Sequence, residues 1–334
     1  MVGLDSILGY VGFISTLVGW FPTNPDQGQV RIKYWAGRDG WNNGFELKES
    51  GGELPKVDIR STSNEWVGHG TMALQWIGSN DQRQVDVDMS KNQEINYLTF
   101  THDGYDATCL ALIGWTPNES IPNAERRKGY IIGDIFRLCG WAWNHSGQSV
   151  RIANTNKYQD VNCGWMVADK NGRDGFVGLL NINLDVMGEH FIGDYKGKDL
   201  CFWGVGMASG RYPRPKKRSL HSPDEHAAAF GNQVRVHKSL SAIELCDSPT
   251  SWGSSFFSIE EGVFCDMSTK TKVPVCKAGE TEGCFVYERP VVNGRGVYST
   301  KRNVGIRGST VKYNATYFVT RDENGRVLDD GKGH

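Results

Sequence analysis

The sequence predicts an all-β fold, an antiparallel β-sandwich of the jelly-roll or lectin type that is held together by disulfides. Three observations carry this prediction. Segments of alternating apolar and polar residues recur along the chain, glycine is abundant with 41 residues, and helical periodicity is almost absent. Many short strands separated by turns are typical of sandwiches and barrels.

Strands with one solvent-exposed face show strict alternation of apolar and polar residues. They are expected at Val30–Trp35, Met72–Ile77 and Val85–Asp88, where apolar residues occupy every second position. Further strands are expected over residues 95–101, 149–153, 161–168, 176–184 and 311–319.

The stretch Thr101–Ser146 contains two short apolar runs, each bounded by Gly, Pro or Asn and each carrying one cysteine. Such runs are typical of buried strands rather than helices. A disulfide between Cys109 and Cys139 would tie the two runs together and stabilise the fold by about 3 to 4 kcal/mol. Cys163 and Cys201 are then expected to pair with each other.

The cysteine content predicts an oxidising compartment. The eight residues are Cys109, Cys139, Cys163, Cys201, Cys246, Cys265, Cys276 and Cys284. Their number is even and no spacing is typical of zinc, so we predict four disulfides in a secreted, extracellular protein. The alternative is a cytosolic protein with scattered thiols. Four cysteines precede Arg218 and four follow it, so each part can form its own bridges. Short spacings favour Cys246–Cys265 and Cys276–Cys284, one of three connectivities.

Composition excludes some partners and supports secretion. The net charge is −1, so the protein as a whole has no positive electrostatic potential that would attract nucleic acid. Three glycosylation sequons, which begin at Asn118, Asn144 and Asn314, favour an extracellular glycoprotein.

Residues 1–22 predict an amphipathic helix, because apolar residues recur at helical spacing between Leu4 and Val18 and Pro22 ends the pattern. The run is too short and too interrupted for a transmembrane span. The helix is expected to dock on the sandwich, to self-associate or to lie on a membrane surface. Because residues 1–21 lack a basic start and a small-residue cleavage site, we expect the natural leader to be absent from this sequence.

The domain order is then a sandwich over residues 25–210, a basic linker over 211–224 and a cysteine-rich region over 225–334 that packs on the sandwich. A short helix is expected within 225–245. The linker is rich in Pro, Ser and basic residues and has no apolar period. Lys217 and Arg218 within it form a candidate site for a kexin-type processing protease. A solvated basic linker and a nuclear-localisation patch are the alternatives.

No catalytic or dinucleotide-binding motif is present in a credible context. His69 and His102 lie in or beside expected strands, with Asp103 and Asp106 near His102, but no nucleophile or third metal ligand can be placed. We therefore predict a protein without enzymatic activity and without a cofactor.

Two further patterns are candidate ligand sites. Asp169, Asn171 and Asp174 form a weak calcium candidate, although an Asn-Gly hairpin turn explains the stretch better. Four tryptophans lie close to cysteines: Trp141, Trp143, Trp165 and Trp203. Packing on disulfides in the core is the ordinary role of such residues. If exposed, Trp141 and Trp143 would be candidates for stacking on sugar rings.

The chain resembles a family of secreted, cysteine-rich fungal proteins whose halves are joined by a kexin-like basic linker. The resemblance rests on Tyr105–Cys109 and Gly133–Trp141, on Cys163–Trp165, and on Phe264–Met267 with the cysteines that follow. It covers about residues 95–286 and not the tail. It implies a fungal, extracellular setting and no particular activity.

The function that these observations favour is that of a secreted, non-enzymatic binding protein, with a carbohydrate, a cell wall or a cell-surface molecule of another organism as partner. The first alternative is a proteolytically processed toxin or effector that associates with membranes or self-assembles through residues 4–18. The second is a hydrolase with an unrecognised site.

Overall fold

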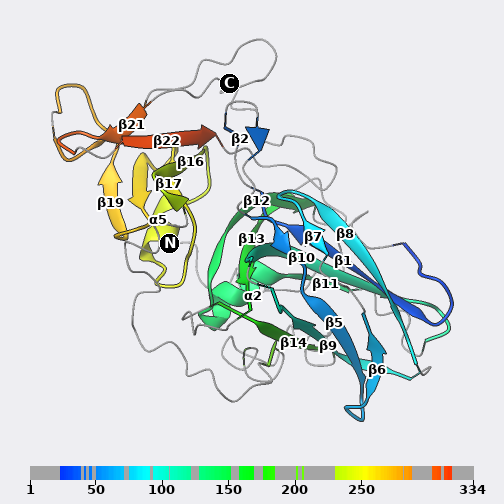
Figure 1. The fold of residues 1–334 in the computed structure, drawn as a ribbon. Helices are drawn as coiled ribbons and strands as arrows, with labels where there is room; N and C mark the ends of the chain where they lie inside the picture. Colours follow the sequence, from blue (N-terminus) through cyan, green and yellow to red (C-terminus); the bar gives the residue numbers. More distant parts are fainter. Residues whose placement is uncertain are drawn as a thin grey trace. The chain divides into compact units, whose positions relative to one another are not determined.

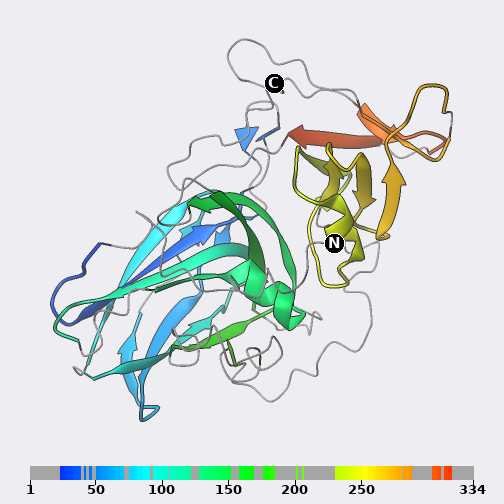
Figure 2. The same ribbon diagram turned by 180° about the vertical axis from the view of Figure 1, so that it is seen from behind.

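The structure of the chain is a computed structural model, shown in Figure 1 and from behind in Figure 2. It describes residues 23–38, 41–42, 45–46, 50–70, 75–90, 93–104, 106–121, 128–151, 158–168, 176–184, 201, 205–206, 230–280, 282–287, 303–309 and 312–317. Contacts divide the chain into two units. Unit 1 comprises Met1–Arg38 and Glu49–Lys216, and unit 2 comprises Asp39–Lys48 and Lys217–His334.

The first sheet of unit 1 is a six-stranded antiparallel sheet of order β12-β13-β10-β1-β8. Strand β10 is central, because β1 pairs with one of its edges while β11 and β13 share the other. All ten residues of β10 are buried, so apolar residues occur on both faces of this strand and do not alternate with polar ones. The strands are β1 (Gln29–Ala36), β8 (Gln82–Asp88), β10 (Thr108–Pro117), β11 (Lys128–Ile131), β12 (Trp143–Arg151) and β13 (Tyr158–Met166).

The second sheet of unit 1 is also antiparallel, in the order β15-β14-β9-β5-β6. Its strands are β5 (Lys56–Ser61), β6 (Trp66–His69), β9 (Ile95–Thr101), β14 (Leu179–Asn183) and β15 (Val205–Gly206). A separate short pair joins β4 (Gly52–Glu53) to β7 (Trp76–Ile77). The two larger sheets touch through aromatic side chains, since the ring of Tyr34 on β1 meets the edge of Phe100 on β9 at a centroid distance of 6.0 Å. The prediction of a β-rich chain in antiparallel sheets is thus confirmed.

The second of the two central apolar runs departs from its expected structure. Instead of one strand, it forms β11, helix α2 (Ile132–Cys139) and the start of β12. Ile132, Ile135 and Phe136 share one helical face and are buried. Gly140 ends the helix in the left-handed conformation, with φ of 75°. In both views α2 lies against β13 (Figures 1 and 2), where a Cβ atom on Gly133 would come within 2.1 Å of the Asn162 backbone.

The helix also explains why two disulfide predictions were wrong. The structure pairs Cys109 with Cys163 and Cys139 with Cys201, not Cys109 with Cys139 and Cys163 with Cys201. Cys109 and Cys163 lie on the neighbouring strands β10 and β13 with a Cα–Cα distance of 5.3 Å. Cys139 is carried away from β10 because it ends α2. The predictions for Cys246–Cys265 and Cys276–Cys284 are confirmed.

Unit 2 is organised around one mixed sheet of order β19-β18-β17-β16-β22-β2-β3, with β21 paired to β22 and β20 to β21. Strand β16 pairs in parallel with both β17 and β22, which an antiparallel prediction did not anticipate. Strands β2 and β3 come from the N-terminal part of the chain, and Trp41 of β2 is in register with Tyr317 of β22. The strands are β2 (Trp41–Asn42), β3 (Phe45–Glu46), β16 (Gln233–His237), β17 (Ser255–Ser258), β18 (Val263–Asp266), β19 (Thr271–Pro274), β20 (Phe285–Val286), β21 (Asn303–Ile306) and β22 (Lys312–Tyr317).

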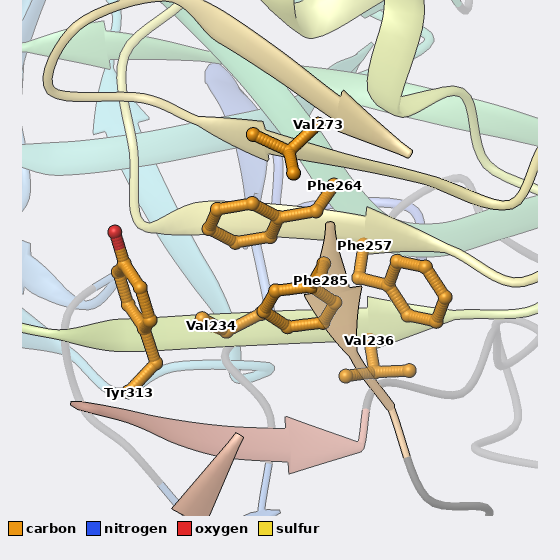
Figure 3. Close-up of a cluster of buried hydrophobic side chains, with 7 residues drawn as sticks. All are labelled: Val234, Val236, Phe257, Phe264, Val273, Phe285 and Tyr313. Carbon is orange, nitrogen blue, oxygen red and sulfur yellow. The ribbon is translucent and has the colours of Figure 1, made fainter. Parts of the chain in front are cut away.

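The core of unit 2 is a cluster of aromatic and β-branched side chains, drawn in Figure 3. Phe264 and Phe285 stack with their ring planes 3° apart and their centroids 4.2 Å apart. Tyr313 of β22 meets the ring of Phe264 from the side, which ties the strand after residue 311 to the cysteine-rich part. The members of the cluster are Val234, Val236, Phe257, Phe264, Val273, Phe285 and Tyr313.

Helix α5 (Ala242–Asp247) overlaps the end of the expected helix region 225–245, in which Gln233–His237 form strand β16 instead. Its N-terminus is capped by Ser241, whose side chain accepts a hydrogen bond from the Glu244 amide. Near its C-terminus Lys270 donates through Nζ to the carbonyl oxygens of Leu245 at 3.2 Å and Ser251 at 2.9 Å, and also to the Ser251 hydroxyl. A half-buried ammonium group therefore links α5 to the turn before β19.

We expect the stability of unit 2 to depend on pH through Lys270. Burial lowers the pKa of Lys270 from 10.5 to about 7, although its oxygen acceptors favour the charged form. Between these two values the unfolded chain binds one more proton than the folded chain, so the free energy of unfolding should rise with pH across this window and level off below it. Denaturant titration at several pH values measures this slope.

The substitution Lys270→Met should remove that slope, since methionine does not titrate. The matched control is Lys272→Met, because Lys272 is exposed and pairs with Asp247 on the surface. A slope that persists in Lys270→Met and is lost in Lys272→Met would contradict the assignment.

Several predicted features lie outside the described residues. They are the helix over 1–22, the linker over 211–224 with its candidate processing site at Lys217 and Arg218, and the turn after residue 321. Among the residues that the structure does describe, no helix has the length and apolar character needed to cross a bilayer.

Candidate functional site

The two tryptophans proposed for sugar stacking are core residues. Trp143 is fully buried and Trp141 is 8% exposed. Trp141 packs edge-on against Phe136 of α2, and Trp143 packs against His145 on its own strand. The exposure that a stacking role requires is therefore absent, and both residues have the core-packing role that is ordinary for tryptophans beside cysteines. Trp165 is buried as well, and Trp203 lies outside the described residues.

The exposed tryptophans of the described chain are Trp66 and Trp76, with 44% and 54% of their surface accessible. Trp66 lies on β6, at the edge of the second sheet of unit 1. A β-bulge between the pairs Ile59–Gly68 and Arg60–Trp66 lets both Trp66 and His69 face outward. The sequence did not indicate Trp66 as a candidate binding residue. In the structure it follows a turn in which Asn64 has φ of 62°.

Alternation along the strands gives the second sheet one apolar and one polar side. Val57, Ile59, Leu98, Phe100, Leu180 and Ile182 are completely buried on the inner side. Their neighbours point the other way and form a surface that we call the polar–aromatic face. It consists of Lys56, Asp58, Arg60, Trp66, His69, Tyr97, Thr101, Asn181 and Asn183, with the buried Thr99 among them.

Strand register arranges the polar–aromatic face in cross-strand rows. In the first row Trp66 is opposite Arg60, Arg60 is opposite Tyr97, and Tyr97 is opposite Asn183. The Arg60 guanidinium carbon lies 3.8 Å from the centroid of the Trp66 ring, a cation–π contact. At the far end of the row the Asn183 side-chain amide donates to the Tyr97 hydroxyl at 3.4 Å. The Arg60 contact, together with the ring of His69 at a centroid distance of 5.5 Å, holds the ring of Trp66 in place while it stays exposed.

The second row consists of His69, Asp58, Thr99 and Asn181. The Nδ1 atom of His69 lies 2.8 Å from the Asp58 carboxylate, and the Thr99 hydroxyl donates to the Asn181 side-chain oxygen at 2.7 Å. The Asp58 carboxylate, Thr99 and Asn181 therefore each have a side-chain partner in this row. Beyond the row, a hydrogen bond to Asp103 at 2.5 Å raises the pKa of Lys56.

The polar–aromatic face combines a fixed, exposed aromatic ring with amide, hydroxyl and charged groups on a rigid sheet. An aromatic ring offers a flat apolar surface to the C–H groups of a sugar, and the surrounding groups can exchange hydrogen bonds with its hydroxyls. The arrangement suits the reversible binding of a neutral, hydroxyl-rich ligand. It places no nucleophile beside a base among the described residues of this surface.

The structure separates the two histidines that the sequence singled out. His69 lies on the polar–aromatic face, whereas His102 follows β9 directly and is buried. The described residues contain no group of three or more histidine, cysteine or acidic side chains that could hold a metal ion. The calcium candidate of Asp169, Asn171 and Asp174 lies outside the described residues.

The sequons differ in their surroundings. Asn144 is only 2% exposed on β12 and its side-chain oxygen accepts a hydrogen bond from the His145 amide, so it is not the surface residue that a glycan requires. Asn118 is partly exposed, and its side-chain amide donates to the Pro25 carbonyl at 2.9 Å. Asn314 lies on β22 of unit 2.

Comparison with known proteins adds no assignment, since no family model and no curated protein matches this chain.

We expect the folded protein to carry no glycan at Asn144. Peptide mapping by mass spectrometry, after expression in a host that glycosylates secreted proteins, should find the Asn144 peptide unmodified because the strand buries the acceptor amide. Full occupancy at Asn144 would mean that β12 is not formed as described.

Proposed function

We propose that the protein is a secreted, non-enzymatic binding protein that holds carbohydrate on the polar–aromatic face. The observation that carries the proposal is the exposed ring of Trp66, fixed by Arg60 and followed across the sheet by Tyr97 and Asn183. An exposed aromatic ring surrounded by hydrogen-bonding groups is typical of a binding surface and not of a packed core.

An extracellular setting supports this proposal. Four disulfides are formed and no described cysteine is unpaired, which is compatible with an oxidising compartment. We further propose that the two sheets of unit 1 form a lectin-like sandwich, for which the contact between Tyr34 and Phe100 is the support. In such a fold the inner sides make the core and an outer side is left for ligand.

The toxin alternative rests on residues 4–18 and on the candidate processing site, both outside the described residues. No observation of the structure favours it over carbohydrate binding.

A glycan array, followed by calorimetry with the best ligand, tests the proposal. The substitution Trp66→Ala should weaken binding by about tenfold or more, the cost expected when an aromatic anchor is lost. The matched control is Tyr158→Ala, since Tyr158 is also exposed but lies on β13 in the other sheet. The proposal fails if Trp66→Ala binds like the unchanged protein while remaining folded.

A further inference from the structure

The first row of the polar–aromatic face crosses four neighbouring strands of the second sheet. Its members are in register with one another, so their side chains project on the same side of the sheet. They are Trp66, Arg60, Tyr97 and Asn183. Neighbouring strands lie about 4.8 Å apart, so the row from β6 to β14 is about 14 Å long. A chain of several sugar units covers this length, whereas a single sugar does not.

Aromatic and polar side chains alternate along this row. One strand separates Trp66 from Tyr97, so their attachment points on the sheet lie about 10 Å apart. That distance matches the repeat of an extended hexose chain of the cellulose or chitin type, in which every second ring presents the same face. Two aromatic side chains at this spacing can contact the first and third units of such a chain, while Arg60 lies beside the second.

The whole of the first row is accessible to a ligand. Trp66 is 44% exposed, and the other three members of the row are each partly exposed. The second row of the face differs, because Thr99 in its middle is only 1% exposed. A continuous ligand therefore fits along the first row and not along the second.

Hydrogen-bonding groups lie between and beyond the two aromatic rings. The Tyr97 hydroxyl accepts a hydrogen bond from the Asn183 side-chain amide at 3.4 Å, and a phenol that accepts in this way can still donate its own hydrogen to a ligand. Arg60 donates through one terminal nitrogen to the Asn64 side-chain oxygen at 3.1 Å, and a guanidinium group has further N–H groups to donate. Both donors suit the hydroxyl and ring oxygens of a sugar chain.

The position of β6 indicates which part of a chain the row accepts. Strand β6 carries Trp66 and is an edge strand of the second sheet in the described structure, so a chain that crosses the strands can continue past Trp66. The interior of a long chain fits such an open row. Neighbouring strands also rotate by about 20–25° relative to one another, so the row suits a single twisted chain better than the flat surface of a crystalline polysaccharide.

We propose that the first row binds the interior of an extended hexose chain of the cellulose or chitin type, with Trp66 on one sugar unit and Tyr97 on the second unit after it. The chain runs across the strands, from β6 towards β14. A disaccharide reaches Trp66 and Arg60, and a trisaccharide is the shortest ligand that also reaches Tyr97. This inference rests on the proposed function, because it adds the class of chain and its direction to a face already proposed to bind carbohydrate.

Calorimetry with cellulose and chitin oligosaccharides, from the monosaccharide to the pentasaccharide, tests this proposal. Affinity should rise roughly fivefold from the disaccharide to the trisaccharide, since an aromatic contact is added at that step. Tyr97→Ala should remove the step while the disaccharide binds as before, and Tyr97→Phe should keep most of it because the ring remains. Tyr158→Ala is the matched control on the other sheet and should leave the series unchanged.

Amide chemical shifts test the same point without a variant. A disaccharide should shift the amides of Trp66 and Arg60, and a trisaccharide should also shift those of Tyr97 and Asn183. Equal affinity for the two ligands, with shifts confined to β5 and β6, overturns the chain model and leaves carbohydrate binding at Trp66 intact. The same holds if neither series binds while the glycan array finds another sugar that needs Trp66. If no glycan binds at all, the proposed function itself is contradicted, and this inference with it.

Discussion

The burial of β10 is the constraint on which unit 1 depends. A strand with no exposed residue needs both faces covered and both edges paired, because its backbone groups cannot turn to water. Strand β1 covers one edge, and β11 and β13 share the other. The Cys109–Cys163 disulfide fixes the same neighbourhood covalently, and Gly37 lies so close that a Cβ atom there would come within 2.9 Å of the Cys163 sulfur.

The same strand also helps to position the polar–aromatic face. Thr108 at the start of β10 holds Glu53, and Gly52 packs so closely on Thr108 that a larger residue would collide with it. From Glu53 the chain runs directly into β5, which carries Asp58 and Arg60 across the polar–aromatic face. The buried strand thus fixes the backbone of Glu53 and, through β5, the outer surface of the second sheet.

Local pattern in the sequence was enough to predict the strands that alternate, such as β1 and β8, and the disulfides that close short loops. It was not enough for the segment around α2. In the sequence, four apolar residues within two helical turns resemble a short buried strand. Because that segment is a helix, Cys139 lies away from β10. The two longer disulfides therefore join Cys109 to Cys163 and Cys139 to Cys201, and not the pairs that the sequence predicted. Parallel pairing of β16 in unit 2 likewise depends on strands far apart in the chain.

The candidate sites depend on cross-strand neighbours, and these are invisible in a single sequence. Thr99 and Asn181 are hydrogen-bonded across 82 residues of sequence. Sequence proximity drew attention to Trp141 and Trp143 beside a cysteine, yet helix packing buries them, while Trp66 is exposed because it lies on an edge strand with a bulge. Glu53 and Trp76 are likewise in register across β4 and β7, although β5 and β6 lie between these strands in the chain.

The contribution of β2 and β3 to the sheet of unit 2 has a consequence for biosynthesis. The ribosome makes Trp41 early and Tyr317, its partner in register, close to the end of translation. Until β22 emerges, the 41–46 hairpin has no sheet to join, so unit 2 cannot be finished as each strand appears. Completion of that unit must follow the synthesis of nearly the whole polypeptide, and the early hairpin stays available to chaperones during that delay.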